Sequence, residues 1–211
     1  MLITNVQKLS VLACFAAATL VAGDTKDEQA MIAVQSGTAS FVANTNVPAV
    51  SIKGKSTALA AKVNLHRLGD GMELEHIDAN LPVKTLVTGM GVRDEHMRKY
   101  IFTTADGQEP DLHFEGEKST CSGSAKDISC QVAGTLTIRG VARPFTLPLK
   151  VREEGAGFKA VGDGVVKLSA YGIEQPTQLG VKTEDDVQVH FDFNAKQVQV
   201  SGALAMLGRG R

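Results

Sequence analysis

Alternation of apolar and polar residues recurs along most of this 211-residue chain, and it limits the possible folds more than any other feature. Residues 185–195, DDVQVHFDFNA, place Val187, Val189, Phe191 and Phe193 at every second position. A period of two is the signature of a β-strand that buries one face. A chain of about eight such strands joined by turns closes into a barrel or stacks as a sandwich. We therefore expect an all-β protein.

The pattern predicts strands in eight segments: 38–44, 61–68, 72–79, 112–117, 129–140, 142–151, 157–170 and 185–195. The Gly69-Asp70-Gly71 turn between the second and third segments is typical of a β-hairpin. Pro144 and Pro148 lie in the segment 142–151. Because proline cannot donate to a ladder, this strand is predicted to be an edge or to be locally broken.

Only the region 84–103 lacks the alternation, and its sequence from 91, GVRDEHMRKYIF, predicts a short helix near 91–100. Adjacent residues on a helix point about 100° apart, so Asp94, Glu95 and His96 do not converge on one metal ion. His96 as a general base would need an orienting acid and a nucleophile. Asp94 is a possible orienting acid, but the chain has no GxSxG nucleophile motif. We expect no catalytic residue, no metal ligand and no cofactor.

The ends of the chain differ from its middle. Residues 1–23 contain Lys8, an alanine-rich apolar run and a small-residue exit near Ala22 and Gly23, which is typical of a secretory signal peptide. The alternatives are an uncleaved anchor and lipid attachment at Cys14. Residues 24–30 form a polar lead-in, and residues 196–211 are assigned to a C-terminal tail. This interpretation predicts a periplasmic or secreted protein.

Charge and cysteine content support these expectations. The chain has 22 basic and 23 acidic residues without a basic stripe, which argues against a nucleic-acid partner.

Cys121 and Cys130 bracket a small polar loop, and export would let them form a disulfide across a hairpin. Two free thiols or half of a metal site are the alternatives, but no CxxC or nearby histidine pair is present.

Two motifs resemble the YceI-like family, also called the polyisoprenoid-binding family. The first spans the charged helix and the strand after it, and the second has the form G-x-L-T-I-x-G-V-x-R-P. The residues that match the first motif are Arg93, Asp94, Met97, Phe102, Pro110 and Phe114. Those that match the second are Gly134, Leu136, Thr137, Ile138, Gly140, Val141, Arg143 and Pro144.

The segment 165–195 is similar to the closing part of the family, with Gly172 and Val187 at the expected places. Leu168 and Ala170 stand where the family usually carries Arg and Asp. An ion pair usual in the family is therefore predicted to be absent, and the binding rim to differ. The resemblance covers residues 31–195, which we take as one YceI-like domain.

The resemblance implies an extended antiparallel, lipocalin-like barrel that encloses an apolar tunnel for an isoprenoid chain. Arg93, Asp94 and His96 would be structural or would lie at the barrel mouth. The side chains expected to line the tunnel are Phe41, Leu65, Leu74, Met97, Phe102, Phe114, Leu136, Ile138, Phe145, Leu147, Tyr171, Val189, Phe191 and Phe193.

Three functions are compatible with these patterns. The favoured one is carriage or sequestration of a long isoprenoid lipid, either a polyprenyl chain or an isoprenoid quinone. The second is an interaction or stress-response module built on a solid barrel. The third is a lipid-acting enzyme that uses His96 or His113 as its base. Expected partners are the lipid, a membrane surface or membrane protein, and a second copy of the chain as a homodimer.

Overall fold

The structure is a computed structural model, and it describes residues 28–68, 71–124 and 126–198. The predicted signal peptide, residues 24–27 of the lead-in, the turn residues 69–70 and residues 199–211 of the tail lie outside the described residues. Strands dominate the described part. They are β1 Glu28–Thr45, β2 Ser51–Ser56, β3 Ala60–Leu68, β4 Gly71–Leu81, β5 Leu112–Ser124, β6 Asp127–Ile138, β7 Val141–Glu154, β8 Gly157–Lys167, β9 Thr177–Gln178 and β10 Val181–Val198.

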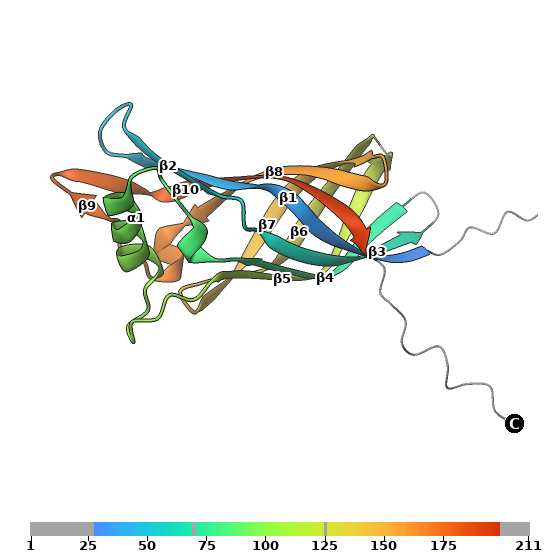
Figure 1. Cartoon of the computed structure of the whole chain (residues 1–211), viewed down its shortest axis with the longest axis horizontal. Helices are drawn as coiled ribbons and strands as arrows, with labels where there is room; N and C mark the ends of the chain where they lie inside the picture. Colours follow the sequence, from blue (N-terminus) through green and yellow to red (C-terminus); the bar gives the residue numbers. More distant parts are fainter. Residues whose placement is uncertain (1–27, 69–70, 125, 199–211) are drawn as a thin grey trace, which may run out of the picture.

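Eight of these strands form a closed antiparallel barrel. Neighbouring strands follow the order β1-β3-β4-β5-β6-β7-β8-β10, and β10 pairs back onto β1, which closes the wall (Figure 1). β1 pairs with β3 through its first part and with β2 through its second part. β9 adds a short hairpin to β10. The predicted barrel of about eight strands is therefore confirmed, whereas β2 and β9 were not predicted because they are short and alternate poorly.

Four short helical segments interrupt the strands. They are η1 Val83–Thr85, α1 Gly91–Met97, η2 Arg98–Phe102 and η3 Leu168–Tyr171. The helix predicted near 91–100 is confirmed by α1 and η2. The strand predicted for 157–170 instead ends at Lys167, because the chain turns into η3 and Gly172 ends that turn with a φ of 66°. Within the described ranges, no helix has the length and apolar character needed to span a bilayer.

The two prolines mark a break in the wall. β7 pairs with β6 from Val141 to Val151, but with β8 only from Leu149 to Glu154. Pro144 and Pro148 both lie in the part of β7 that has no β8 partner. The predicted local break is confirmed, and its cause is that these residues bring no N–H to the ladder.

The buried residues form two clusters at opposite ends of the barrel. The first, the helical-end cluster, joins barrel residues to Val83, Leu86, Phe102 and Tyr171 of the helical region. The second, the terminal-end cluster, includes Ile32, Leu65 and Met72, near the start of β1 and the end of β3. Figure 1 shows α1 at one end of the elongated barrel and the first and last described strands meeting at the other.

The predicted disulfide links β5 and β6 within the terminal-end cluster. Cys121 and Cys130 face each other in the register, with their Cα atoms 4.2 Å apart, and both are buried. The bridge therefore ties two neighbouring strands of the barrel and fills part of its interior.

Removing this bridge should weaken the barrel. For Cys121→Ala/Cys130→Ala we expect a free energy of unfolding lower by about 2–3 kcal/mol, because a short closed loop restricts the unfolded chain. Denaturant unfolding monitored by circular dichroism measures the difference. A reductant should destabilise the wild type and leave the double variant unchanged. Equal stability of the two proteins would show that the bridge contributes nothing.

Candidate ligand-binding lumen

The predicted tunnel residues all lie in the two clusters. Leu65, Phe102, Ile138 and Tyr171 are buried. The others are partly buried side chains packed against one cluster or the other: Phe41, Leu74, Met97, Phe114, Leu136, Phe145, Leu147, Val189, Phe191 and Phe193.

The partial burial of these side chains leaves part of their surface accessible. Where the wall is paired, an inward-pointing side chain is screened from outside water, so its accessible area faces the lumen or an end of the barrel. Phe145 and Leu147 also lie in the stretch of β7 that has no β8 partner. Within the described residues, the largest side chains that are less than 2% exposed are Ile173, Val83 and Cys130, none of them aromatic. A densely packed core would enclose large side chains completely. Most of the large inward-pointing side chains of the barrel are therefore only partly enclosed by their neighbours.

Glycines on the barrel wall provide room for the phenyl rings. A Cβ atom added at Gly134 would lie 2.6 Å from Cζ of Phe114, and one at Gly164 would lie 3.0 Å from Cζ of Phe145. The two rings also meet edge to face, with centroids 6.4 Å apart. Rings that occupy the space above glycines lie close to the wall, which leaves more of the lumen free.

The charged helix belongs to the closure of the helical end. Asp94 is 8% exposed, and its Oδ1 accepts hydrogen bonds from the Thr88 backbone N–H at 2.7 Å and hydroxyl at 2.5 Å. The Thr88 side-chain hydrogen bond is the main reason that the pKa of Asp94 lies below its usual value of 3.8. Asp94 thus joins α1 to the preceding loop and does not orient His96.

The other two residues predicted for the mouth make contacts within the helical segment itself. The His96 ring packs edge-on against Tyr100, with centroids 5.8 Å apart. Arg93 donates to the sulfur of Met90 at the start of α1. Met97 and Ile101 of the same segment pack against the helical-end cluster. The helical segment is thus amphipathic and covers the end of the barrel.

Residues of the second sequence motif also help to close the helical end of the barrel. Arg139 and Gly140 form the β6–β7 turn with positive φ angles, and Arg143 Nε donates to the Ala170 carbonyl at 2.7 Å. This bond holds η3 against the barrel, where burial raises the pKa of Tyr171. Leu168 is 5% exposed in the same cluster, so an apolar side chain occupies one of the positions that differ from the family pattern.

The terminal end contains a cavity of about 310 Å³. Arg67 and Glu153 meet there, with Nη2 and Oε1 2.5 Å apart. The cavity is lined by Ala30, Ile32, Leu65, Arg67, Glu153, Phe158 and Gln197. Sequence reasoning missed both charged residues. The available signal was their position, because Arg67 continues the inward alternation of Val63 and Leu65, and Glu153 continues that of β7.

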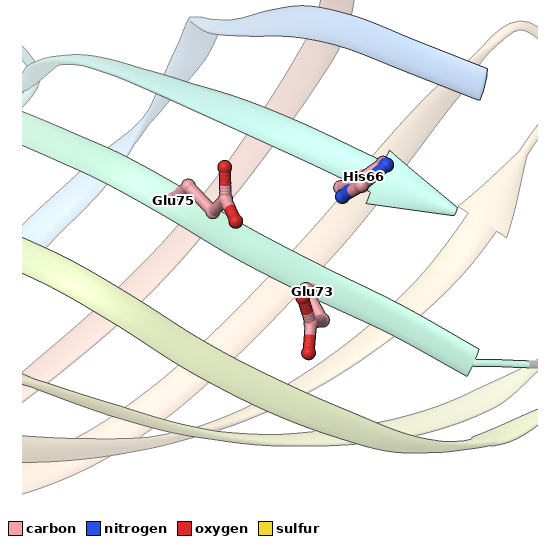
Figure 2. A group of neighbouring side chains, drawn as sticks. All are labelled: His66, Glu73 and Glu75. Carbon is pink, nitrogen blue, oxygen red and sulfur yellow. The ribbon is translucent and has the colours of Figure 1, made fainter. Parts of the chain in front are cut away.

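Two groups of potential metal ligands lie on β3, β4 and β5. His66, Glu73 and Glu75 offer ligand atoms within 4.8 Å of one another, as do Asp78, His113 and Glu115. Figure 2 shows His66 on β3 beside the two glutamates of β4. Nζ of Lys118 lies 2.8 Å from Oε2 of Glu73, and Nε2 of His113 lies 3.1 Å from Oε1 of Glu115. These groups are ion-pair networks on the face opposite Leu65, Leu74 and Phe114, outside the lumen.

The family assignment follows from comparison with known proteins. The YceI-like domain matches residues 29–195, most of the chain. The chain belongs to the YceI-like family. The YceI-like barrel also resembles a polyisoprenoid-binding domain from Saccharophagus degradans, with a TM-score of 0.56 and 18% identity, covering 82% of this chain and 100% of that one.

Two further comparisons support the same fold. BcnA of Burkholderia cenocepacia has a TM-score of 0.56 and 20% identity, covering 75% of this chain and 95% of that one. The YCEI protein of Campylobacter jejuni has a TM-score of 0.57 and 17% identity, covering 73% and 89% of the two chains. A UPF0312 protein of Pseudomonas paraeruginosa is 28% identical over 108 residues, 47% of this chain. That match spans about half, 53%, of the relative's own length.

The Asp94 contact predicts a pH-dependent loss of stability. Its folded-state pKa is depressed, so the stabilisation is complete above the unfolded-state pKa and is lost as pH falls through the folded-state pKa. We expect Asp94→Asn to lower the free energy of unfolding at pH 7 by about 1.5–3 kcal/mol, the range for hydrogen bonds to a charged group. The deficit should shrink below pH 3.8. Denaturant unfolding across pH measures it, with the exposed Glu95→Gln as control, and a constant deficit would contradict the mechanism.

Proposed function

We propose that this YceI-like protein is exported and holds a long isoprenoid chain in its barrel, for carriage or sequestration of the lipid. The family and the fold support a lipid-binding barrel at the general level. The length of the bound lipid and the carriage role are inferred from the apolar side chains that line the lumen.

One observation carries the proposal: inward phenylalanines remain partly accessible along a closed antiparallel barrel. Phe114 and Phe145 lie over wall glycines, while Phe191 and Phe193 continue the apolar lining along β10. A narrow, aromatic, weakly polar interior suits a branched hydrocarbon chain, which needs apolar contact over its length and few hydrogen bonds.

The energetics favour a long chain. Burying about 20 methylene equivalents at about 0.8 kcal/mol each gives about 16 kcal/mol. If association costs on the order of 8 kcal/mol, about 8 kcal/mol remains, which corresponds to a dissociation constant near 1 µM. A short isoprenoid with half of that surface would gain too little to bind. Affinity should therefore rise steeply with the number of isoprene units.

Export is supported by the buried disulfide between Cys121 and Cys130. Structural disulfides form and persist in oxidising compartments such as the periplasm and the extracellular space. The signal-like sequence of residues 1–23 agrees with this proposal. A mature protein in the periplasm would lie between membranes that contain isoprenoid lipids.

The positions of the candidate bases do not favour an enzyme. His113 points away from the lumen and pairs with Glu115, and His96 packs on Tyr100 at the helical end. Neither imidazole is placed beside the inward phenylalanines, where a bound lipid chain would lie. The solid-barrel alternative is distinguished from lipid binding by direct chemical analysis.

The first test identifies the lipid that co-purifies with the protein. We expect native mass spectrometry of the exported protein to show an added mass, and solvent extraction to release an isoprenoid. Delipidated protein should then take up added solanesol and not geraniol, because the shorter chain buries too little surface. Protein that carries no lipid and takes up neither compound would support the solid-barrel module.

The second test fills the lumen from its wall. In Gly164→Val the new Cβ would lie 3.0 Å from Cζ of Phe145 and 3.3 Å from Cγ2 of Val189, so the added side chain crowds the inward apolar residues. We expect solanesol affinity to fall about tenfold or more, equivalent to about two lost methylene contacts. Isothermal titration calorimetry measures this loss. Val165→Leu adds bulk at a neighbouring exposed position and should bind as the wild type does. Equal affinities for both variants would place the ligand elsewhere.

A further inference from the structure

The ion pair between Arg67 and Glu153 crosses the interior of the barrel. β3 and β7 are opposite each other in the wall, because three strands separate them in either direction around the barrel. Arg67 is the second-to-last residue of β3, and Glu153 is the second-to-last residue of β7. The two side chains therefore meet across the terminal end of an otherwise apolar lumen.

The surroundings of the pair combine one polar edge with an apolar wall. The Arg67 guanidinium lies over the Phe158 ring, 5.9 Å from its centroid. Ile32 and Leu65, which line the same cavity, belong to the terminal-end cluster. Gln197 adds an amide to the lining. A cavity of about 310 Å³ is near the lower end of the range for small-molecule sites, so it suits a lipid head group and not a whole isoprenoid chain.

The charges of this cavity are balanced. Among the described residues that line it, Arg67 is the one cation, and Glu153 already neutralises it. The nearby cation Lys159 lies on the opposite face of β8 from Phe158 and is paired with Asp192. A diphosphate would thus meet a carboxylate without an uncompensated cation to bind it.

We propose that this cavity binds the uncharged oxygen-containing head of an isoprenoid, a hydroxyl or a quinone carbonyl, and rejects a diphosphate head. Arg67 donates a hydrogen bond to the head-group oxygen, and Glu153 accepts one from a hydroxyl. Glu153 also repels an anionic head, so it acts as an element of selectivity. This inference rests on the proposed lipid-binding function and specifies its ligand class.

Three ligands with the same hydrocarbon tail test the proposal: solanesol, the ubiquinone that carries a solanesyl chain, and solanesyl diphosphate. Calorimetric titration of the delipidated protein should show the alcohol or the quinone binding at least about tenfold more tightly than the diphosphate, the effect of one close like-charge contact. The order of the alcohol and the quinone shows which uncharged oxygen the cavity prefers.

Variants of the pair separate selectivity from general binding. Glu153→Gln leaves Arg67 unneutralised and should reduce or reverse the preference against the diphosphate, by about tenfold. Arg67→Gln should strengthen that preference, because Glu153 then stands alone. Arg152→Gln and Glu154→Gln are matched controls, since these residues form their own exposed ion pair, 2.6 Å long, on the other face of β7. The controls should leave the ratio of affinities unchanged.

The outcomes distinguish the two proposals. Diphosphate binding as tightly as the alcohol and quinone in the wild type would overturn the head-group selectivity while preserving the lipid-binding function. An equal shift in Glu154→Gln and Glu153→Gln would also overturn it. Binding of none of the three ligands would overturn the proposed function and, with it, this inference. Thermal unfolding monitored by circular dichroism confirms that each variant is folded.

Discussion

The pairing of β1 with β10 is the contact on which the rest of the structure depends. It joins the first and last long strands over most of their length, from the pairing of Met31 with Val198 to that of Thr45 with Thr183. Without it the sheet would have two long open edges and one solvated apolar face. With it, the alternating apolar residues of eight strands point into one shared interior. Closure therefore creates both the stability of the barrel and its lumen.

The interior is organised along the barrel axis. Helical segments and the Arg143 contact to η3 complete one end, and the disulfide with its neighbours packs the other. Between these ends, Phe114 and Phe145 lie over Gly134 and Gly164 of the wall. Under the proposed function, these partly buried rings would contact the hydrocarbon ligand.

A polar group inside such a barrel strongly affects which ligand binds, because the lining around it is mostly apolar. The Arg67–Glu153 pair is half-exposed at the terminal end, where it contacts both the cavity and the apolar lining. Charged side chains on the outer face form local pairs, such as that of His190 Nδ1 with Asp163 Oδ1 at 2.7 Å. The division between an apolar lining and a charged exterior is what a lipid-binding barrel requires in water.

Much of this arrangement could be predicted from the sequence. The alternation identified the strands and their inward residues, because side chains on a strand point to opposite faces in turn. The prolines of β7 predicted its broken pairing, and the spacing of Cys121 and Cys130 predicted a hairpin bridge. The helix of residues 91–100 was recognisable from the loss of alternation. Each of these predictions depends on neighbours in the sequence or on one hairpin.

The order of the strands around the barrel was decided only by the tertiary structure. Arg67 and Glu153 are far apart in the sequence, and no local pattern shows that β3 and β7 face each other across the lumen. The same holds for Asp94, whose partner proved to be Thr88 and not His96. The sequence by itself determined which side chains point inward. Which of them meet depended on the closure and register of the barrel, because these fix distances between strands that no local periodicity encodes.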